Sequence, residues 1–331
     1  MGAPAILGTG SAVPAGIRKN DDPIFTWIHQ TPPPNSDLFA GYRERRVLGP
    51  NEDLGGLMIQ AATNALGAAG VVAGEIDLVL GYASFGQWAM PNDLVTMAAK
   101  LGVPSTAMIM PINSEYANFE HGLLTAEGLI STGRASSALI VVGADWTRYV
   151  DYRTPPCVSA GDGAGAEVMG ASDDGTLWRI KDVAVAAERQ YLGGMYVKAD
   201  PTEPPTPPAP QTWGPPLFHF DPILGGEGFK NFGMPVPPQL VEEVLARNGL
   251  TPADIAFIGH QTTIVLNKVW QAALKPGIFV ETLKTYANMT AASIPVNFDV
   301  WAKKITTDHV ALVGLGPEPS CTVVLLSRNG A

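Results

Sequence analysis

Six short apolar runs recur along the chain, and each is bounded by glycine or by a polar residue. Each is rich in aliphatic residues and lacks the apolar–polar alternation of a strand with one exposed face. They occupy residues 5–8, 78–81 and 138–143 in the first half and residues 255–259, 310–314 and 322–326 in the second. The runs therefore predict short strands that are buried on both faces of a sheet.

Two segments between these runs carry apolar residues at helical spacing. Residues 53–70 form one such segment, and residues 237–248 form another that Gly249 follows as a helix stop. Strands that alternate with helices of this length predict a layered α/β fold. Because both halves of the chain show this arrangement, we expect a pseudo-duplication, with one half at residues 1–175 and the other at residues 176–331.

Residues 200–216 interrupt the pattern. Proline recurs throughout this segment, and proline lacks the N–H that helix and sheet interiors require. The segment therefore predicts an extended surface loop over the site or an interface, rather than a linker between domains.

Composition and charge narrow the class of protein. Of the 331 residues 46% are hydrophobic and 16% are charged, which is typical of a well-buried globular protein. The net charge of −10 argues against binding to nucleic acid phosphates. No apolar stretch is long enough for a membrane span, and the first residues do not resemble a signal peptide, so we expect a cytoplasmic location. Arg43, Arg45 and Arg46 form one basic cluster, either a solvated turn or an anion contact.

The chain contains two cysteines, Cys157 and Cys321. Two cysteines in a chain of this kind indicate neither a disulfide framework nor a zinc site, and no metal is expected. Cys321 begins the apolar run 322–326 and is expected to be a core thiol. Cys157 precedes a glycine-rich turn and is expected to be structural as well.

Two polar residues stand out in the second half. His260 directly follows the predicted strand 255–259, and the carboxyl ends of strands face the crevice where α/β sheets bind ligands. Asn288 precedes a helix of small residues, where it could cap that helix or present its amide to a substrate. Either residue alone would be read as structural.

Taken together, these two segments resemble the C-terminal catalytic motifs of ketoacyl-ACP synthase III. Further similarities lie at residues 6–14, 42–46, 133–145 and at the glycine-rich turn 161–166. The resemblance implies a five-layered α-β-α-β-α thiolase fold, a homodimer and thioester chemistry. It implies no bound cofactor: the acyl thioester of coenzyme A or phosphopantetheine would be a substrate, and an acyl carrier protein a possible partner.

The sequence departs from this family at the nucleophile. The family carries an Ala-Cys-Ala-Gly-Phe segment, and the corresponding residues here place Tyr116 at the cysteine position and Phe119 at the phenylalanine. A tyrosine is a poor acyl carrier because its pKa is about 10, so Tyr116 is expected to donate a hydrogen bond or to form a pocket wall. Ser114 is a second candidate nucleophile, although the sequence shows no activating base beside it.

The resemblance implies roles for the remaining residues. His260 and Asn288 would donate hydrogen bonds to a thioester carbonyl, or His260 would take a proton from an acceptor. The backbone N–H groups of Gly316 and Tyr116 would form an oxyanion hole. Met90 resembles the residue that crosses the dimer into the partner's acyl pocket, which Trp88 and Phe119 would also line. The family's adenine-stacking tryptophan is not found near residues 35–40, which favours a carrier-protein thioester over coenzyme A.

Three hypotheses follow from these residues. The first is an acyltransferase or condensing enzyme of specialised metabolism that joins an acyl group to a small acceptor without a cysteine acyl-enzyme. The second is a decarboxylase of malonyl-type thioesters. The third is a non-catalytic partner subunit of a condensing enzyme, which the presence of both His260 and Asn288 disfavours.

Overall fold

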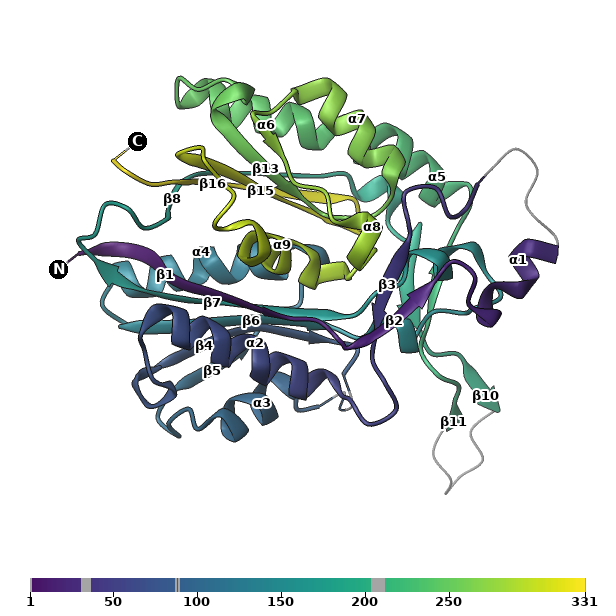
Figure 1. Ribbon diagram of the computed structural model, residues 1–331. Helices are drawn as coiled ribbons and strands as arrows, with labels where there is room; N and C mark the ends of the chain where they lie inside the picture. Colours follow the sequence, from purple (N-terminus) through teal and green to yellow (C-terminus); the bar gives the residue numbers. More distant parts are fainter. Residues whose placement is uncertain (1, 31–36, 87, 89, 204–211, 331) are drawn as a thin grey trace.

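The computed structural model of the chain describes residues 2–30, 37–86, 88, 90–203 and 212–330. Two five-stranded sheets lie face to face with helices α4 (Asn118–Ser131) and α9 (Ser293–Trp301) between them (Figure 1). Helices α2 (Leu54–Ala69) and α3 (Asp93–Leu101) cover the outer face of one sheet, and α6 (Val236–Arg247) and α7 (Ile264–Leu274) cover the other. The five predicted layers of the α/β fold are therefore confirmed.

The two sheets have the same topology. The first has the order β1-β7-β6-β4-β5 and the second, read from its matching edge, the order β8-β16-β15-β13-β14. In each sheet the first two pairings are antiparallel and the last two are parallel. The strands are β1 (Ala3–Ala12), β4 (Leu78–Ser84), β5 (Met108–Pro111), β6 (Ser137–Ala144), β7 (Gly163–Ser172), β8 (Arg179–Ala187), β13 (Ile255–Gly259), β14 (Ile278–Phe279), β15 (His309–Gly316) and β16 (Ser320–Ser327). The boundary predicted at residue 175 falls between β7 and β8.

The two predicted helices have the expected ends. Helix α2 begins after Asp53, whose side chain accepts a hydrogen bond from the N–H of Gly56 at 2.7 Å, and ends at Gly70 in the left-handed conformation. Helix α6 is followed by Gly249, which also has a positive φ of 67°. None of the helices among the described residues is long and apolar enough to cross a membrane.

The glycine-rich segment 161–166 is mostly strand, not the predicted turn. Strand β7 begins at Gly163 and pairs with both β1 and β6. The glycines allow α9 to lie directly on the sheet, because a Cβ on Gly165 would lie only 2.6 Å from Cβ of Pro295. Glycine-rich composition thus marks close packing here.

Arg45, the middle residue of the predicted basic cluster, lies neither in a solvated turn nor at an exposed anion site. This residue lies in β3 (Glu44–Val47), which pairs with β2 (Gly16–Lys19), and its side chain is fully buried. Its guanidinium lies over the rings of Phe25, Phe39 and Tyr42 at 5.1–5.6 Å and donates to the carbonyl of Val158 at 2.6 Å. Cation–π contacts thus replace water around this charge, and burial lowers the pKa of Arg45 to about 10.

Short elements surround the carboxyl ends of the strands of the two large sheets. These elements are α1 (Thr26–Gln30), β9 (Met195–Lys198), β10 (Pro201–Glu203), β11 (Thr212–Trp213), β12 (Leu217–Phe220), α5 (Leu224–Gly228) and α8 (Leu283–Tyr286).

The proline-rich segment was predicted to be an extended loop. Its described ends, β10 and β11, instead pair as a two-stranded antiparallel ladder. Residues 204–211 lie outside the described residues.

Candidate active site

A cavity of about 770 Å³ opens at the carboxyl ends of β13 and β15. Four residues predicted from the sequence line it: Tyr116, His260, Asn288 and Gly316. His260 follows β13, Gly316 ends β15, Tyr116 lies just before α4, and Asn288 lies between α8 and α9. The fold thus brings residues from four separate segments to one cavity.

His260 is 1% exposed and forms the floor of this cavity with Tyr116. The two rings are stacked, with their centroids 4.4 Å apart and their planes 9° from parallel. Neither ring nitrogen has a well-formed hydrogen bond to a described residue. Burial lowers the pKa of His260 to about 3, and the Thr290 backbone opposes this shift only weakly. The imidazole is therefore neutral and can accept a proton or donate a hydrogen bond.

Asn288 is held through its backbone and through one atom of its side chain. Its carbonyl accepts hydrogen bonds from Gly161 N–H at 3.0 Å and from Trp146 Nε1 at 2.7 Å, and its N–H donates to the Ser159 carbonyl at 2.8 Å. Its Oδ1 accepts the N–H of Thr290 at 2.8 Å. Because an N–H donor fixes the oxygen on that side, the Nδ2 amine is the group left to donate to a ligand.

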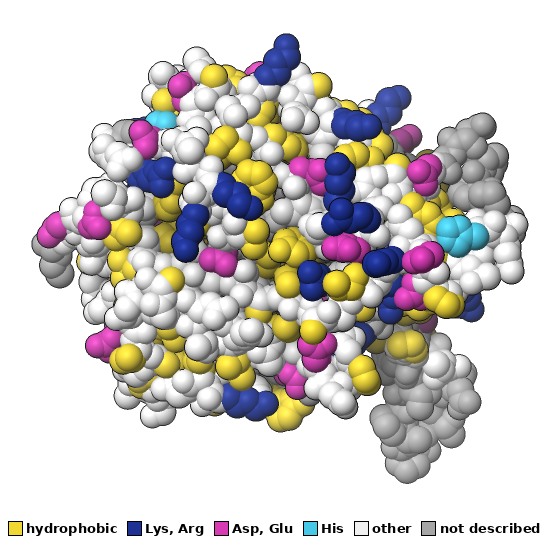
Figure 2. Space-filling model, viewed as in Figure 1, with side chains coloured by type: hydrophobic (Ala, Val, Ile, Leu, Met, Phe, Trp, Pro, Cys, Tyr) yellow, Lys and Arg dark blue, Asp and Glu magenta, His cyan; other side chains and the backbone are white. Residues whose placement is uncertain are grey.

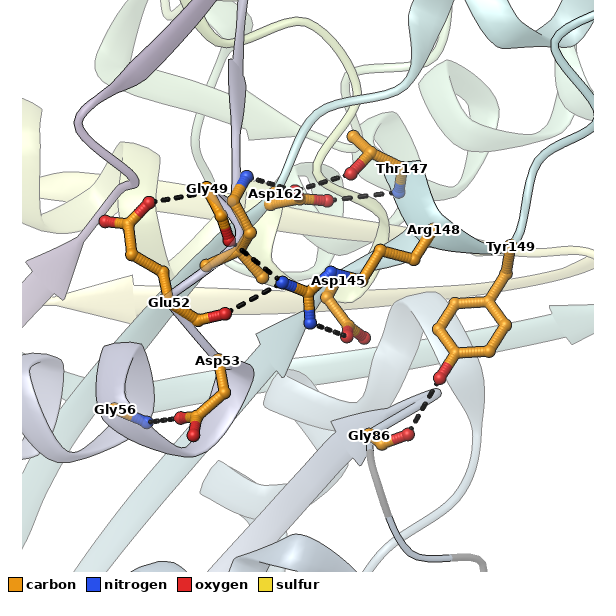
Figure 3. Close-up of polar contacts among 11 residues, drawn as sticks. Gly49, Glu52, Asp53, Gly56, Gly86, Asp145, Thr147, Arg148, Tyr149 and Asp162 are labelled. Atoms are coloured by element: carbon orange, nitrogen blue, oxygen red, sulfur yellow. Dashed lines mark hydrogen bonds and ion pairs between the residues drawn. The ribbon is translucent and has the colours of Figure 1, made fainter.

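A polar network supports the segment that holds Asn288. Asp162, next to Gly161, accepts hydrogen bonds from the N–H of Thr147 at 3.1 Å, from its hydroxyl at 2.6 Å, and from Leu48 N–H at 2.9 Å (Figure 3). Nearby, Arg148 Nη2 donates to the carbonyls of Gly49 and Glu52. Burial raises the pKa of Asp162 to about 6, and these hydrogen bonds oppose the shift. The network links the loop before α2 to the start of β7.

Tyr116 lies in a strained turn. The preceding residue, Glu115, has a φ of 45°, in the left-handed region that favours glycine. Burial, together with the charges of Glu115 and Glu318, raises the pKa of the Tyr116 phenol far above its ordinary value. The phenol is therefore a neutral hydrogen-bond donor and does not ionise under ordinary conditions.

Gly316, at the end of β15, lies close to two polar side chains. A Cβ on Gly316 would lie 2.5 Å from Oγ of Ser320 and 2.7 Å from Oε2 of Glu318, so these side chains would have to move to admit a larger residue. Gly316 itself lines the cavity. Its predicted use as an oxyanion donor stays a prediction.

Aromatic and prolyl side chains form much of the remaining wall, and no Asp, Glu, Lys or Arg is among the described residues that line the cavity. The sequence analysis missed these residues, although two of them alternate along β12. They are Trp146, Pro155, Pro156, Phe218, Phe220, Pro222 and Phe229. The cavity therefore suits an apolar or aromatic group with a few polar atoms, since hydroxyl and imidazole side chains such as Thr262, Thr263 and His219 also line it.

The other candidate residues lie away from the cavity lining. Phe119 is 1% exposed and packs in the core between the sheets. Trp88 lines a separate shallow depression beside α3, and Met90 is 89% exposed. Ser114 lies beside His121, with 2.7 Å between Oγ and Nδ1.

Neither cysteine lines the cavity. Cys157 and Cys321 are both buried in hydrophobic clusters, as expected of structural thiols. Burial raises the pKa of both thiols, that of Cys157 to about 12. Among the described residues, no group of His, Cys, Asp and Glu is arranged to hold a metal ion.

Comparisons with known proteins agree with this architecture. Residues 110–188 match the family model of 3-oxoacyl-[acyl-carrier-protein (ACP)] synthase III, and residues 245–327 match the model of its C-terminal region. Over 332 residues the chain is 31% identical to β-ketoacyl-[acyl-carrier-protein] synthase III 2 of Streptomyces avermitilis, covering 96% of each chain. It is 32% identical to synthase III 4 of Streptomyces coelicolor, covering 94% of each.

Solved structures share the fold at lower identity. The synthase III of Aquifex aeolicus superimposes with a TM-score of 0.81 at 23% identity, covering 98% of this chain and 100% of that one. The priming β-ketosynthase of the R1128 polyketide pathway gives 0.83 at 24% identity, covering 99% and 97%. OleA of Xanthomonas campestris gives 0.81 at 16% identity, covering 98% of each chain.

Proposed function

Because the chain belongs to the ketoacyl-ACP synthase III family, we propose that it transfers an acyl group from a thioester to a small acceptor. One observation carries this proposal: a neutral His260 and the Nδ2 amine of Asn288 face the same apolar cavity. The transfer proceeds without a cysteine acyl-enzyme, because neither cysteine lines that cavity.

We propose a role for each of the three side chains. The Nδ2 amine of Asn288 donates to the thioester carbonyl, where negative charge develops as a bond forms or breaks. His260 donates to the same oxygen or takes a proton from the acceptor, since its ring is neutral. The phenol of Tyr116, stacked on His260, supplies a further donor or a flat wall.

The cavity lining favours a neutral, apolar substrate portion. Without a charged side chain among its described lining residues, the cavity would not stabilise a phosphate or a free amino acid group. An acyl chain, an aromatic acceptor or a pantetheine arm fits this lining, and a coenzyme A or carrier-protein thioester supplies two of these. We place the activity in specialised metabolism, since an altered nucleophile position suits a changed reaction on an unchanged fold.

The surface bears on the choice of thioester carrier. Lysine and arginine side chains on the face shown in Figure 2 lie among acidic ones rather than in one continuous basic area. An acidic carrier protein would therefore dock through a few local charges. The segment expected to replace the family's adenine contact includes residues 35 and 36, which lie outside the described residues.

We also propose a homodimer formed along strand β5. This strand is an edge of the first sheet, and unpaired edge N–H and C=O groups favour pairing with another strand. Met108 on β5 is 56% exposed and Met90 is 89% exposed, so both side chains are free to pack against a second copy. Light scattering of the purified chain tests this arrangement: a dimer that Met108→Lys converts to a monomer supports it, and a monomeric wild type rejects it.

Kinetics with acetyl-, octanoyl- and malonyl-thioesters, of coenzyme A and of a phosphopantetheinylated carrier, test the activity. We expect a free thiol to be released in the presence of a phenol or amine acceptor, and His260→Ala to slow this release by about 100-fold or more. Carbon dioxide released from the malonyl thioester alone would identify the decarboxylase instead, which the pairing of Asn288 with His260 also supports. If the protein turns over none of these thioesters, the result would favour the third hypothesis, a non-catalytic partner subunit of a condensing enzyme.

A further inference from the structure

A second polar cluster lies next to the cavity and outside its lining. Oγ of Ser114 lies 2.7 Å from Nδ1 of His121, and Nε2 of the same ring lies 3.1 Å from Oγ1 of Thr322. The cluster joins the turn before α4, the first half of α4 and strand β16. Thr322 is 1% exposed, whereas Ser114 and His121 are partly exposed.

The orientation of Ser114 is not that of a helix cap. Ser114 occupies the N-cap position of the helical segment that begins at Glu115, where a serine Oγ ordinarily accepts a backbone N–H from the first turn. Its Oγ makes no such bond, and its own N–H donates to Oδ1 of Asn118 at 2.5 Å. Its hydroxyl lies 3.3 Å from that oxygen but only 2.7 Å from Nδ1 of His121. The imidazole is thus the nearer of the two partners of this hydroxyl, and the proposal below takes the hydroxyl proton to be shared with it.

The contacts of His121 favour the tautomer that accepts this proton. An Nε2–H that donates to Thr322 leaves the lone pair of Nδ1 facing Ser114. Burial lowers the pKa of His121, and the charge of Glu318 opposes this shift. A neutral imidazole hydrogen-bonded to a serine hydroxyl is the arrangement that activates serine as a nucleophile.

We propose that Ser114 accepts the acyl group and that His121 is its general base, with Thr322 as a positioning residue. The inference rests on the proposed acyl transfer, since the same thioester is the donor. Ser114 is two residues from Tyr116, so their Cα atoms are at most ~7 Å apart. The proposal places the thioester carbonyl beside Ser114, which is partly exposed and two residues from Tyr116 of the cavity lining.

The step balances without any further reactant. Oγ of Ser114 attacks the thioester carbonyl carbon while its proton passes to Nδ1 of His121. The C–S bond breaks, the thiolate takes the proton from Nδ1, and an acyl-serine ester remains. An acceptor O–H or N–H then gives its proton to Nδ1, attacks the ester carbonyl, and the Oγ of Ser114 leaves and recovers the proton.

A donor for the oxyanion lies beside the serine. Nδ2 of Asn118 is buried without a hydrogen-bond partner among the described residues. The Oδ1 of the same amide group accepts the N–H of Ser114, so this NH2 group lies close to the serine.

Intact-protein mass spectrometry with peptide mapping tests this inference, using a fluorophosphonate, acetyl-coenzyme A and octanoyl-coenzyme A as probes. We expect one covalent adduct on Ser114, absent in Ser114→Ala and formed about 100-fold more slowly in His121→Gln. Thr322→Val should slow labelling by about tenfold. Ser131→Ala is the matched control, because that serine is exposed at the end of α4 and outside the cavity lining, and it should label at the wild-type rate.

The outcomes separate this inference from the proposed function. An adduct that persists unchanged in Ser114→Ala, or no adduct at Ser114 with any probe, would overturn the role of Ser114. His260→Ala should keep fluorophosphonate labelling at Ser114 and lose acyl transfer. If the fluorophosphonate labels Ser114 but the wild-type protein transfers no acyl group from any thioester, the proposed function fails while the serine nucleophile stands.

Discussion

The two halves of the molecule repeat one topology and place different chemistry at the same point. In each half a turn leads into the helix of that half in the central layer: the turn after β5 leads into α4, and the turn after β14 and the short helix α8 leads into α9. Tyr116 lies in the first of these turns and Asn288 in the second. The duplicated fold thus brings two equivalent positions together, and the side chains decide what each one does.

Both turns hold residues in the left-handed backbone region. Glu115 has a φ of 45° in the first turn, and Ala287 and Thr290 have φ values of 57° and 48° in the second. Each such residue costs roughly 1–2 kcal/mol, and strain of this kind collects at functional turns. The supporting contacts differ: backbone hydrogen bonds from Ser159 and Gly161 hold the second turn, whereas side chains of Asn118 and His121 hold the first.

The largest expected effect is on the second turn. In Asn288→Asp the side-chain oxygen can still accept the N–H of Thr290, but the amine donor is lost. We expect kcat for acyl transfer to fall by about 100- to 1000-fold with little change in melting temperature. Asn288→Ala, which also removes the acceptor, should lose a similar amount. A kcat within about threefold of wild type in Asn288→Asp would remove Asn288 from the reaction.

The next effect tests how the first half supports the second. Both carboxylate oxygens of Asp162 accept hydrogen bonds, three in total. In Asp162→Asn the amide NH2 group would replace one of these oxygens and would face another donor. We expect the free energy of unfolding to fall by about 3 kcal/mol in urea at pH 7.5. Thr147→Val removes only the hydroxyl and should cost about 1 kcal/mol. Equal losses in the two variants would show that the carboxylate charge does not hold this network.

The strands and capped helices could be predicted because local pattern and burial agree there. Val79 and Leu80 in β4, and Phe257 and Ile258 in β13, are buried on both faces of their sheets, as continuous apolar runs predict. Gly165 shows the opposite case. Its glycine-rich surroundings indicate a turn locally, and only the approach of α9 explains why a strand needs glycine there.

The candidate site was predictable only in part. His260 and Asn288 were found because they follow recognisable strand and turn patterns. His121 was overlooked as a partner of Ser114, although seven residues span two helical turns and place both near one face. The aromatic wall from Phe218 and Phe220 depends on how β12 folds back over the cavity, and no local pattern records that.

A smaller effect, on the pH dependence of stability, is expected from a buried carboxyl group in one of the two central helices. Glu120 of α4 is buried with no partner for either oxygen among the described residues, whereas Asp299 of α9 accepts from Thr9 and Ser11. Burial raises the pKa of Glu120 to about 8. Because the folded-state pKa of Glu120 is raised, its contribution to stability is fully present below the pKa of a glutamate in the unfolded chain. This contribution is lost as the pH rises through the folded-state pKa of about 8. Between pH 6 and pH 8 the wild type should lose about 2 kcal/mol relative to Glu120→Gln.

Denaturant unfolding at several pH values measures this difference. Glu120→Gln keeps the shape of the side chain and removes the ionisation, so subtracting its pH profile from that of the wild type leaves the contribution of Glu120. Asp299→Asn is the matched control on α9: it keeps Glu120 and should therefore still lose stability between pH 6 and pH 8. Parallel profiles for wild type and Glu120→Gln would mean that the carboxyl of Glu120 is hydrated in the folded protein.

The smallest expected effect isolates strain in the first turn. Glu115→Ala and Glu115→Gly both remove the buried carboxyl, whose pKa burial and the charge of Glu318 raise to about 7. Only glycine also relieves the left-handed φ of 45°. Glycine ordinarily destabilises relative to alanine by increasing the entropy of the unfolded chain. Here we expect Glu115→Gly to be the more stable variant by about 1 kcal/mol in urea at pH 6. If Glu115→Ala proves equal or more stable, the first turn is unstrained and the parallel with the turn at Asn288 is one of topology alone.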